Sequence, residues 1–129
     1  MIFFGMNPTC ILTRISSGVM QEKALKKGSI ILVSFPFTDL SGEKRRPALA
    51  VAVSSDHCVA LFITSRTQGD PSWHVPIEAS DRTGLVLPSI IRCDKVASFD
   101  VRIVQGEVGT VSLASVKRVD AKLRQLLKL

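Results

Sequence analysis

From Ser29 onward the chain consists of short apolar runs separated by turn residues, and this pattern restricts the possible folds more than any other feature. The strongest runs are Ser29–Phe35, Pro47–Ser54 and Cys58–Thr64, which are rich in β-branched and apolar side chains. A short polar turn joins the last two runs, as in a hairpin. Weaker runs follow at Trp73–Ile77, Ser89–Asp94 and Arg102–Val108. Short strands at this spacing predict a small, closed or nearly closed β-barrel rather than alternating strands and helices.

The end of the chain has a helical period instead. Ser112 suits the N-cap position, and five apolar residues recur at helical spacing after it: Val116, Val119, Leu123, Leu126 and Leu127. Lys128 would lie in the last turn, where the helix dipole favours a cation. We expect an amphipathic C-terminal helix that packs across one end of the barrel.

The first 20 residues are apolar but do not resemble a targeting segment. No Lys or Arg precedes Arg14, and Asn7-Pro8 interrupts the apolar run, so neither a secretory signal nor a membrane span of about 20 apolar residues is indicated. We expect residues 1–20 to be a poorly ordered or non-native extension, with translation starting at Met20. Residues 21–129 would then form one domain with a single core.

The sequence lacks the motifs of several enzyme classes. Cys10, Cys58 and Cys93 are widely spaced and form no CxxC pair, which indicates a reducing, cytoplasmic location and no zinc site. There is no Gly-rich phosphate loop, no HExxH and no nucleophile elbow. We therefore expect neither a metal nor a cofactor. The two histidines are not expected to be catalytic: His57 falls in a turn, and His74 is predicted to have a core or rim position.

The net charge of +6 is concentrated at the two ends of the chain. Residues 1–27 carry four Lys or Arg against one acidic residue, and residues 111–129 carry five against one. Residues 28–110 carry eight Lys or Arg against nine Asp or Glu. A long basic stripe is therefore not the expected source of affinity for nucleic acid, and phosphate contacts in the middle would need local clusters.

Three such clusters of polar residues fall at or near predicted strand ends. Lys44-Arg45-Arg46 ends a polar loop, and Thr64-Ser65-Arg66 closes the third run. Arg92 and Asp94 alternate on a later run and so share one face. From the pattern alone, a surface salt bridge that contributes little to stability explains this last pair equally well.

These segments together resemble the MazF/PemK toxin family. The resemblance begins with Lys27-Gly28, Phe35-Pro36-Phe37-Thr38-Asp39 and Lys44-Arg45-Arg46-Pro47-Ala48-Leu49. It continues with Phe62-Ile63-Thr64-Ser65, Thr83-Gly84-Leu85, Pro88-Ser89-Ile90-Ile91-Arg92-Cys93-Asp94 and Val108-Gly109-Thr110-Val111-Ser112. It covers about residues 26–127 in order, and it implies a mainly β fold: a small SH3-like β-barrel of the MazF/PemK/CcdB type with an amphipathic C-terminal helix.

The resemblance also implies an activity, the metal-independent cleavage of single-stranded RNA. In such a reaction the 2′-hydroxyl of the substrate attacks the adjacent phosphate and leaves a 2′,3′-cyclic phosphate, so the protein supplies alignment, charge stabilisation and proton transfer. By position, the residues expected to act in catalysis are Arg46, Thr64, Arg92 and Asp94. Those expected to bind RNA are Phe37, Thr38, Ser41, Lys44, Arg45, Ser65 and Arg66.

Physical chemistry limits these roles. Arginine, with a pKa above about 12, is a poor proton donor, so Arg46 and Arg92 would mainly stabilise the phosphate in the transition state. Thr64 would hydrogen-bond a phosphate oxygen, and Asp94 is the candidate base. For base stacking the candidates are Phe37 and Trp73, although Trp73 could equally belong to the core and a core position is favoured for Phe37.

The resemblance finally implies two protein partners: a second copy of the chain in a homodimer, and a MazE-like antitoxin with an acidic, disordered tail. Two other functions remain open at this stage. One is a toxin of the same barrel fold that inhibits DNA gyrase without being an enzyme, and the other is a barrel that binds RNA without cutting it.

Overall fold

The computed structural model describes residues 10–14, 20–35, 44–67 and 69–129. In chain order the strands are β1 (Cys10–Arg14), β2 (Met20–Ala24), β3 (Ser29–Phe35), β4 (Lys44–Val53), β5 (His57–Thr64), β6 (His74–Ile77), β7 (Ser89–Asp100) and β8 (Val104–Thr110). Two 3-10 turns, η1 (Pro71–Trp73) and η2 (Val101–Ile103), precede β6 and β8, and helix α1 (Leu113–Leu127) ends the chain. The prediction of a mainly β barrel with a C-terminal helix is confirmed.

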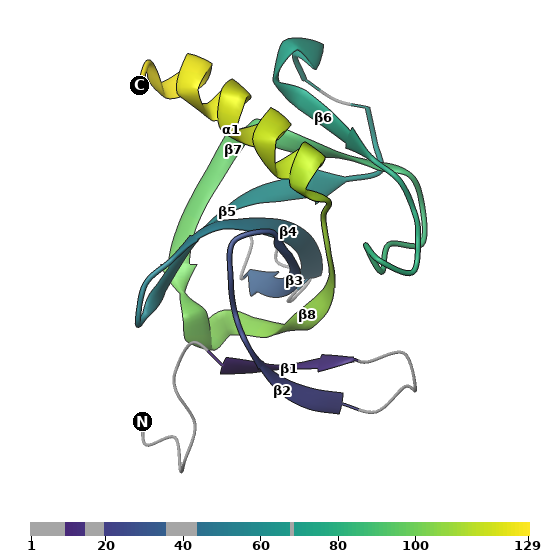
Figure 1. The fold of residues 1–129 in the computed structure, drawn as a ribbon, viewed down its shortest axis with the longest axis vertical. Coiled ribbons are helices and arrows are strands. Elements are labelled where there is room, and N and C mark those ends of the chain that lie inside the picture. The colour runs from purple at the N-terminus through teal and green to yellow at the C-terminus, as the bar shows by residue number, and fades with distance from the viewer. Residues whose placement is uncertain (1–9, 15–19, 36–43, 68) are drawn as a thin grey trace.

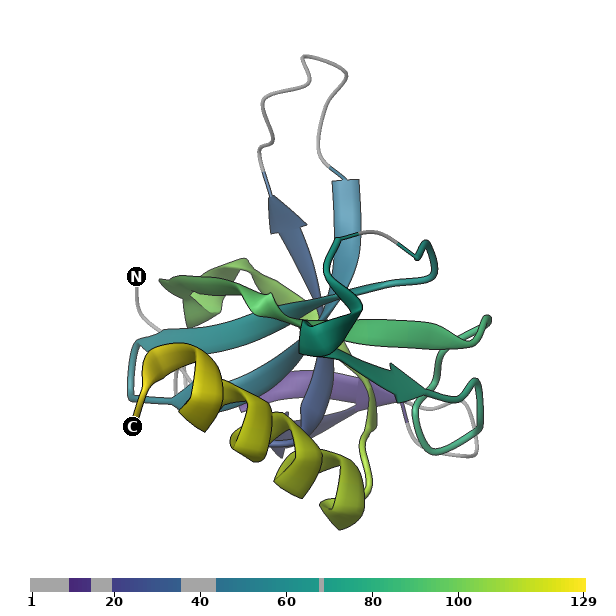
Figure 2. The ribbon, with the colours of Figure 1, turned by 90° about the horizontal axis from the view of Figure 1, so that it is seen from above.

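The eight strands form one strongly curved sheet in the order β2-β1-β8-β3-β4-β5-β7-β6 (Figure 1). The neighbours from β8 to β6 pair antiparallel, whereas β1 pairs parallel with β8. Figure 2 shows α1 lying along one side of this sheet. The helix contacts β6 and β7, so it covers the end of the sheet that these two strands form.

The central strands are buried on both faces. One face of β3, β4 and β5 contributes to a core cluster that includes Ile31, Val33, Ala48, Ala50 and Ala60. The alternate residues belong to a second cluster that also contains Val119 of α1; they include Ile30, Leu49, Leu61 and Ile63. Two buried faces explain why these runs are almost continuously apolar in the sequence.

Helix α1 begins as predicted. The side chain of Ser112 accepts a hydrogen bond from the backbone N–H of Ser115 at 3.2 Å, which is the N-cap interaction. Val119 is buried, and Val116 and Leu123 pack against the same cluster. Lys128 adopts a left-handed conformation and caps the carboxyl end. Within the described ranges, no helix has the length and hydropathy needed to cross a membrane.

Part of residues 1–20, for which the sequence predicted a poorly ordered or non-native extension, lies in the sheet. Cys10–Arg14 forms β1, which pairs with β2 along its whole length and meets β8 at the single pair Thr13 and Glu107. β2 neighbours only β1 in the sheet order, so β1 is its connection to the other strands. Residues 1–9 and 15–19 lie outside the described part of the chain.

Candidate active site

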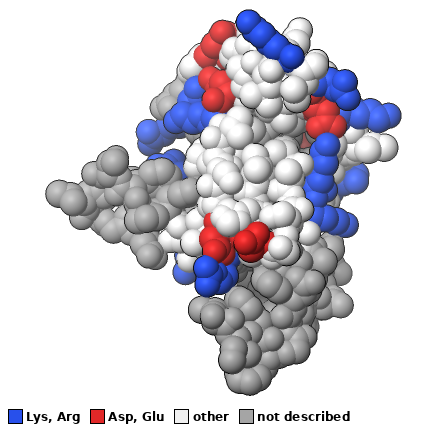
Figure 3. Space-filling view, turned by 90° about the vertical axis from the view of Figure 1, so that its left-hand side faces the viewer, with Lys and Arg blue, Asp and Glu red and all other residues white. Residues whose placement is uncertain are grey.

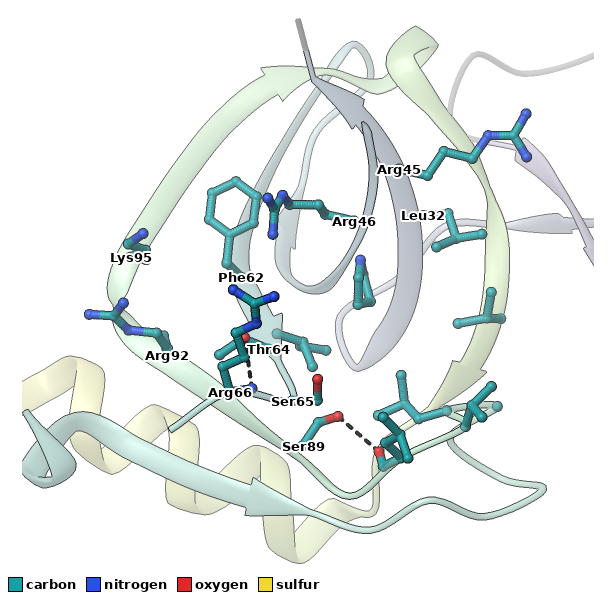
Figure 4. Close-up of a pocket in the computed structure, with 17 residues that line it drawn as sticks. Leu32, Arg45, Arg46, Phe62, Thr64, Ser65, Arg66, Ser89, Arg92 and Lys95 are labelled. Carbon is teal, nitrogen blue, oxygen red and sulfur yellow. Dashed lines mark hydrogen bonds between the residues drawn. The ribbon is translucent and has the colours of Figure 1, made fainter. Parts of the chain in front are cut away.

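An open groove of about 1000 Å³ runs past the ends of β4 and β5 (Figure 4). Its charged lining residues are all cations: Arg45, Arg46, Arg66, Arg92 and Lys95. No Asp or Glu is among the described residues that line it. The groove also has an apolar portion, with Leu32, Phe62, Leu85, Val86, Leu87 and Val108. Cationic and apolar surfaces in one groove suit a ligand that carries both negative charge and apolar surface.

Five Lys and Arg side chains line the groove. The face drawn in Figure 3 has Lys and Arg interspersed with Asp and Glu around a band without charge. This agrees with the balanced charge of residues 28–110 in the sequence. An anion would therefore be held by the local arrangement of a few guanidinium and ammonium groups.

The end of β5 supplies two hydroxyl groups and a cation. Thr64, Ser65 and Arg66 all line the groove, as the sequence predicted that they would lie together. The backbone N–H of Arg66 donates a hydrogen bond to Thr64 Oγ1 at 3.1 Å. Because the hydroxyl oxygen accepts this bond, its own hydrogen is left to donate elsewhere. Thr64 can therefore present an O–H donor to a bound oxyanion.

Arg92 and Asp94 form a two-pronged ion pair on β7. Arg92 Nη2 donates to Asp94 Oδ2 at 3.0 Å, and Arg92 Nε donates to Oδ1 at 3.3 Å. The side chains are 12% and 24% exposed, respectively, so this is more than a solvated surface pair. Arg92 lines the groove, whereas Asp94 lies behind it as its partner. The pair holds the guanidinium plane in a fixed orientation.

A bulge in β7 places this pair. Ile91 pairs with Ile63 and Val96 pairs with Leu61, so residues 92–95 lie opposite Phe62 alone. Extra residues in one strand bend it and redirect its side chains, and such bulges are common beside functional sites. Here the bulge lets both Arg92 and Lys95 reach the groove, although regular alternation would put them on opposite faces.

The backbone of Gly69 lies directly against Arg92. A Cβ atom at Gly69 would stand 2.4 Å from Arg92 Nη2 and 2.9 Å from Cζ, and the residue has φ +80°. Only glycine fits both the left-handed conformation and this close approach. The guanidinium group is therefore enclosed between the backbone at Gly69 and the carboxylate of Asp94.

The structure unites most of the residues that the sequence singled out. Arg45, Arg46, Thr64, Ser65, Arg66 and Arg92 line one groove, and Asp94 joins it through Arg92. Phe37, Thr38 and Ser41 lie outside the described residues, and Lys44 is described only as the first residue of β4. Trp73 packs against the second core cluster. Sequence reasoning missed Phe62 and Lys95, because the first lies in an apolar run and the second is in the groove only through the bulge.

The histidines and the described thiols lie outside the groove lining. His57 was expected in a turn but is the first residue of β5; it is exposed, with Nδ1 3.1 Å from Asp56 Oδ1. His74 is buried on β6, in register with Arg92, and its Nε2 has no hydrogen-bond partner within the described structure. Burial raises the pKa of both Cys58 and Cys93 to about 11, so these thiols stay protonated. Among the described residues, no three His, Cys, Asp or Glu side chains cluster as metal ligands would.

Known structures share this fold. An endoribonuclease in complex with its cognate antitoxin, from a mycobacterial species, matches with a TM-score of 0.66 and 18% identity over 82% of this chain and 97% of that chain. MazF from Deinococcus radiodurans matches with a TM-score of 0.64 and 22% identity over 81% and 96%. A MazE-MazF structure from the same organism matches with a TM-score of 0.65 and 23% identity over 81% of this chain and 96% of that chain.

At these identities the structural matches establish a common fold. No protein with a curated description matches the sequence. The model of one protein family, however, matches residues 26–127, which is most of the chain and the span in which the motifs were found. The chain therefore belongs to the PemK-like, MazF-like toxins of type II toxin-antitoxin systems.

Proposed function

We propose that this protein is an endoribonuclease that cleaves single-stranded RNA without a metal ion, using the 2′-hydroxyl of the substrate as nucleophile. One observation carries the proposal: five cationic side chains and three hydroxyl groups, those of Thr64, Ser65 and Ser89, line a single groove in which no described lining residue is acidic. The endoribonuclease of known structure with the same fold supports it. As the bond from the 2′-oxygen to phosphorus forms, the bond to the 5′-oxygen breaks and that oxygen takes a proton from solvent, so the products would be a 2′,3′-cyclic phosphate and a free 5′-hydroxyl.

The groove residues would stabilise the transition state as charge develops on the phosphate. Arg46 and Arg92 would bind its non-bridging oxygens, and Thr64 would donate a hydrogen bond to one of them. Arginine suits this role because the N–H donors of its planar guanidinium group match the geometry of a phosphate. The group also stays positively charged. Such groups supply electrostatic stabilisation and positioning, which are what a reaction with a substrate nucleophile requires.

Asp94 would take the proton from the 2′-hydroxyl. Its two carboxylate oxygens each accept one hydrogen bond from Arg92, and each retains a second lone pair for the substrate. The same ion pair would keep Arg92 aimed at the groove.

Two protein partners follow from this proposal. Val86 and Leu87, at the apolar side of the groove, are 90% and 58% exposed, and a second copy of the chain in a homodimer would cover such a surface. Relatives of the same fold have been solved with their antitoxins. We propose that an antitoxin with an acidic, disordered segment occupies the cationic groove and excludes RNA electrostatically.

The test is to incubate the purified protein with a mixed single-stranded RNA pool in EDTA and to map the ends of the fragments. Cleavage that leaves cyclic phosphates supports the proposal. Arg46→Ala should abolish cleavage, whereas Arg118→Ala, which removes an exposed cation of α1 outside the groove, should not. Intact RNA together with inhibited DNA gyrase would indicate a non-enzymatic toxin. RNA that is bound but uncut, with or without Arg46, would indicate a plain binding barrel.

A further inference from the structure

Phe62 occupies a distinctive position between the cations of the groove. It is half-buried on β5, and its neighbours Leu61 and Ile63 are buried on the opposite face of the strand. Its register partner on β4 is Ala48, which has a small side chain. On the other side, β7 bulges away over residues 92–95. The Phe62 ring therefore has only the methyl group of Ala48 on one side and the β7 bulge on the other. This leaves room for a ligand in the groove to contact the ring.

The charged side chains that line the groove around the ring are cations. Figure 4 shows the guanidinium group of Arg46 beside the Phe62 ring and Arg66 close to it, with Lys95 and Arg92 along β7 and the Arg92 side chain pointing away from the ring. A cation over or beside an aromatic ring is attracted to its π-electrons, which helps to order both groups. A ligand that stacks on this ring would thus meet phosphate-binding groups on several sides.

Phe62 is also adjacent to the residue proposed to contact the scissile phosphate. Phe62 and Thr64 are two residues apart on β5 and point to the same face, a separation of about 7 Å along the strand. This is comparable to one nucleotide step of an extended single strand. A phosphate at Thr64 would therefore place a neighbouring base over Phe62.

We infer that Phe62 is a stacking platform for a nucleobase that flanks the cleaved phosphodiester, an inference that rests on the proposed endoribonuclease function. Stacking uses the π-face that every base has, so the platform adds affinity and tolerates different bases. The bases with larger rings stack more strongly, so a modest preference for a purine at this position follows. Discrimination by hydrogen bonding would come from other groups.

Three variants test the role of the ring. Phe62→Leu keeps an apolar side chain but removes the aromatic face, and Phe62→Trp restores a face. Val59→Ala is the matched control, because Val59 is a half-buried apolar residue of the same strand that does not line the groove. For a short RNA we expect Phe62→Leu to raise KM about 5- to 150-fold, the range for loss of one stacked base, with kcat nearly unchanged. Phe62→Trp should restore KM, and Val59→Ala should change it little.

A second measurement uses the wild-type protein and does not depend on the folding of any variant. RNAs with a single abasic residue at each position around the cleavage site are compared for KM. We expect one flanking position at which removal of the base raises KM as Phe62→Leu does, and Phe62→Leu should be insensitive to that change. Equal KM values for all abasic RNAs, or a folded Phe62→Leu protein with wild-type KM, would overturn the inference.

The outcomes separate this inference from the proposed function. If the wild-type protein leaves all RNAs intact, the endoribonuclease proposal fails. The same abasic series, read as binding affinity, then still decides whether a base stacks on Phe62. If the wild-type protein cleaves RNA but no flanking base matters, the enzyme proposal stands and the platform is rejected.

Discussion

Arg92 and Asp94, two residues apart on a bulged strand, are joined by two hydrogen bonds of 3.3 and 3.0 Å, and only the arginine lines the groove. The carboxylate thus orients the guanidinium group. It also keeps free lone pairs that can accept a hydrogen bond from a further donor. A regular strand would also put the two side chains on one face. The bulge takes residues 92–95 out of the ladder with β5, and this lets Lys95 line the same groove as Arg92.

Replacement of Asp94 separates its two proposed roles. Asp94→Asn keeps an acceptor oxygen toward Arg92 but cannot take a proton at neutral pH. We expect kcat to fall about 100-fold or more with little change in KM, the range for loss of a general base. Steady-state kinetics over a range of pH measure this. If Asp94→Asn retains full activity while Asp94→Ala does not, Asp94 only orients Arg92.

Gly69 should be needed to position Arg92. Gly69→Ala would place a methyl group 2.4 Å from Arg92 Nη2, so the guanidinium group must move. A displacement near 1 Å in a reacting site lowers kcat on the order of 100-fold. The matched control is Gly28→Ala, which has a similar φ of +95° but would place its Cβ at an ordinary 3.6 Å from Val116.

Both glycine variants should lose about 1 kcal/mol of stability from backbone strain, and thermal unfolding would show this. Only Gly69→Ala should lose activity in addition. Equal activity losses in the two variants would mean that strain, not the contact with Arg92, is responsible.

The buried thiols should make stability depend on alkaline pH. Burial raises the pKa of Cys58 and Cys93 from 9.0 to about 11, so the folded protein holds these protons more tightly than the unfolded chain. The stability they contribute is complete below about pH 9 and is lost as the pH rises toward 11. Urea unfolding at pH 8 and pH 10.5 measures it, compared with the Cys58→Ala/Cys93→Ala variant, whose decline should be smaller.

Reactivity offers an independent check on the same thiols. At pH 8 an alkylating reagent should modify Cys58 and Cys93 far more slowly in the folded protein than in urea. Mass spectrometry of peptides resolves each site. Rapid modification of either thiol in the folded protein would contradict its burial.

A buried polar pair should contribute to stability away from the groove. Ser29 and Glu107 are 0% and 5% exposed, and Ser29 Oγ donates to Glu107 Oε2 at 2.5 Å. Ser29→Ala removes this donor from a buried carboxylate, so we expect the free energy of unfolding to fall by about 1–3 kcal/mol. Chemical denaturation measures it, with the exposed Ser98→Ala as control. Identical midpoints for both variants would show that the carboxylate does not depend on Ser29.

Much of the architecture could be predicted from local patterns. The run Ser29–Phe35 coincides with β3, and Cys58–Thr64 differs from β5 by one residue, because apolar runs between turn residues mark buried strands well. β7 was the least well predicted: it continues from Asp94 to Asp100 through a stretch of mixed polarity, where pairing with β5 rather than its own pattern defines the strand. β1 was missed for a similar reason, since its partners lie elsewhere in the chain.

The groove shows the same division between local and long-range information. Arg46 and Thr64 were found from motifs, and Arg92 and Asp94 were correctly placed on one face by strand alternation. Lys95 could not be found in this way, because alternation turns it away from Arg92 and only the bulge brings it back. Phe62 had the pattern of a core residue, and the contact of Gly69 with a guanidinium group has no local signature.

The double-sided packing of β4 and β5 has an evolutionary consequence. Arg46 and Thr64 project from strands fixed by apolar layers above and below, whereas Leu85, Val86 and Leu87 belong to a connecting segment outside any strand. Substitutions in the connecting segment should lower the stability of the fold little. Substitutions in β4 and β5 should lower it more, because these strands pack on both faces. If the proposed function holds, descendants of such a protein could acquire new target sequences while they inherit the same catalytic residues.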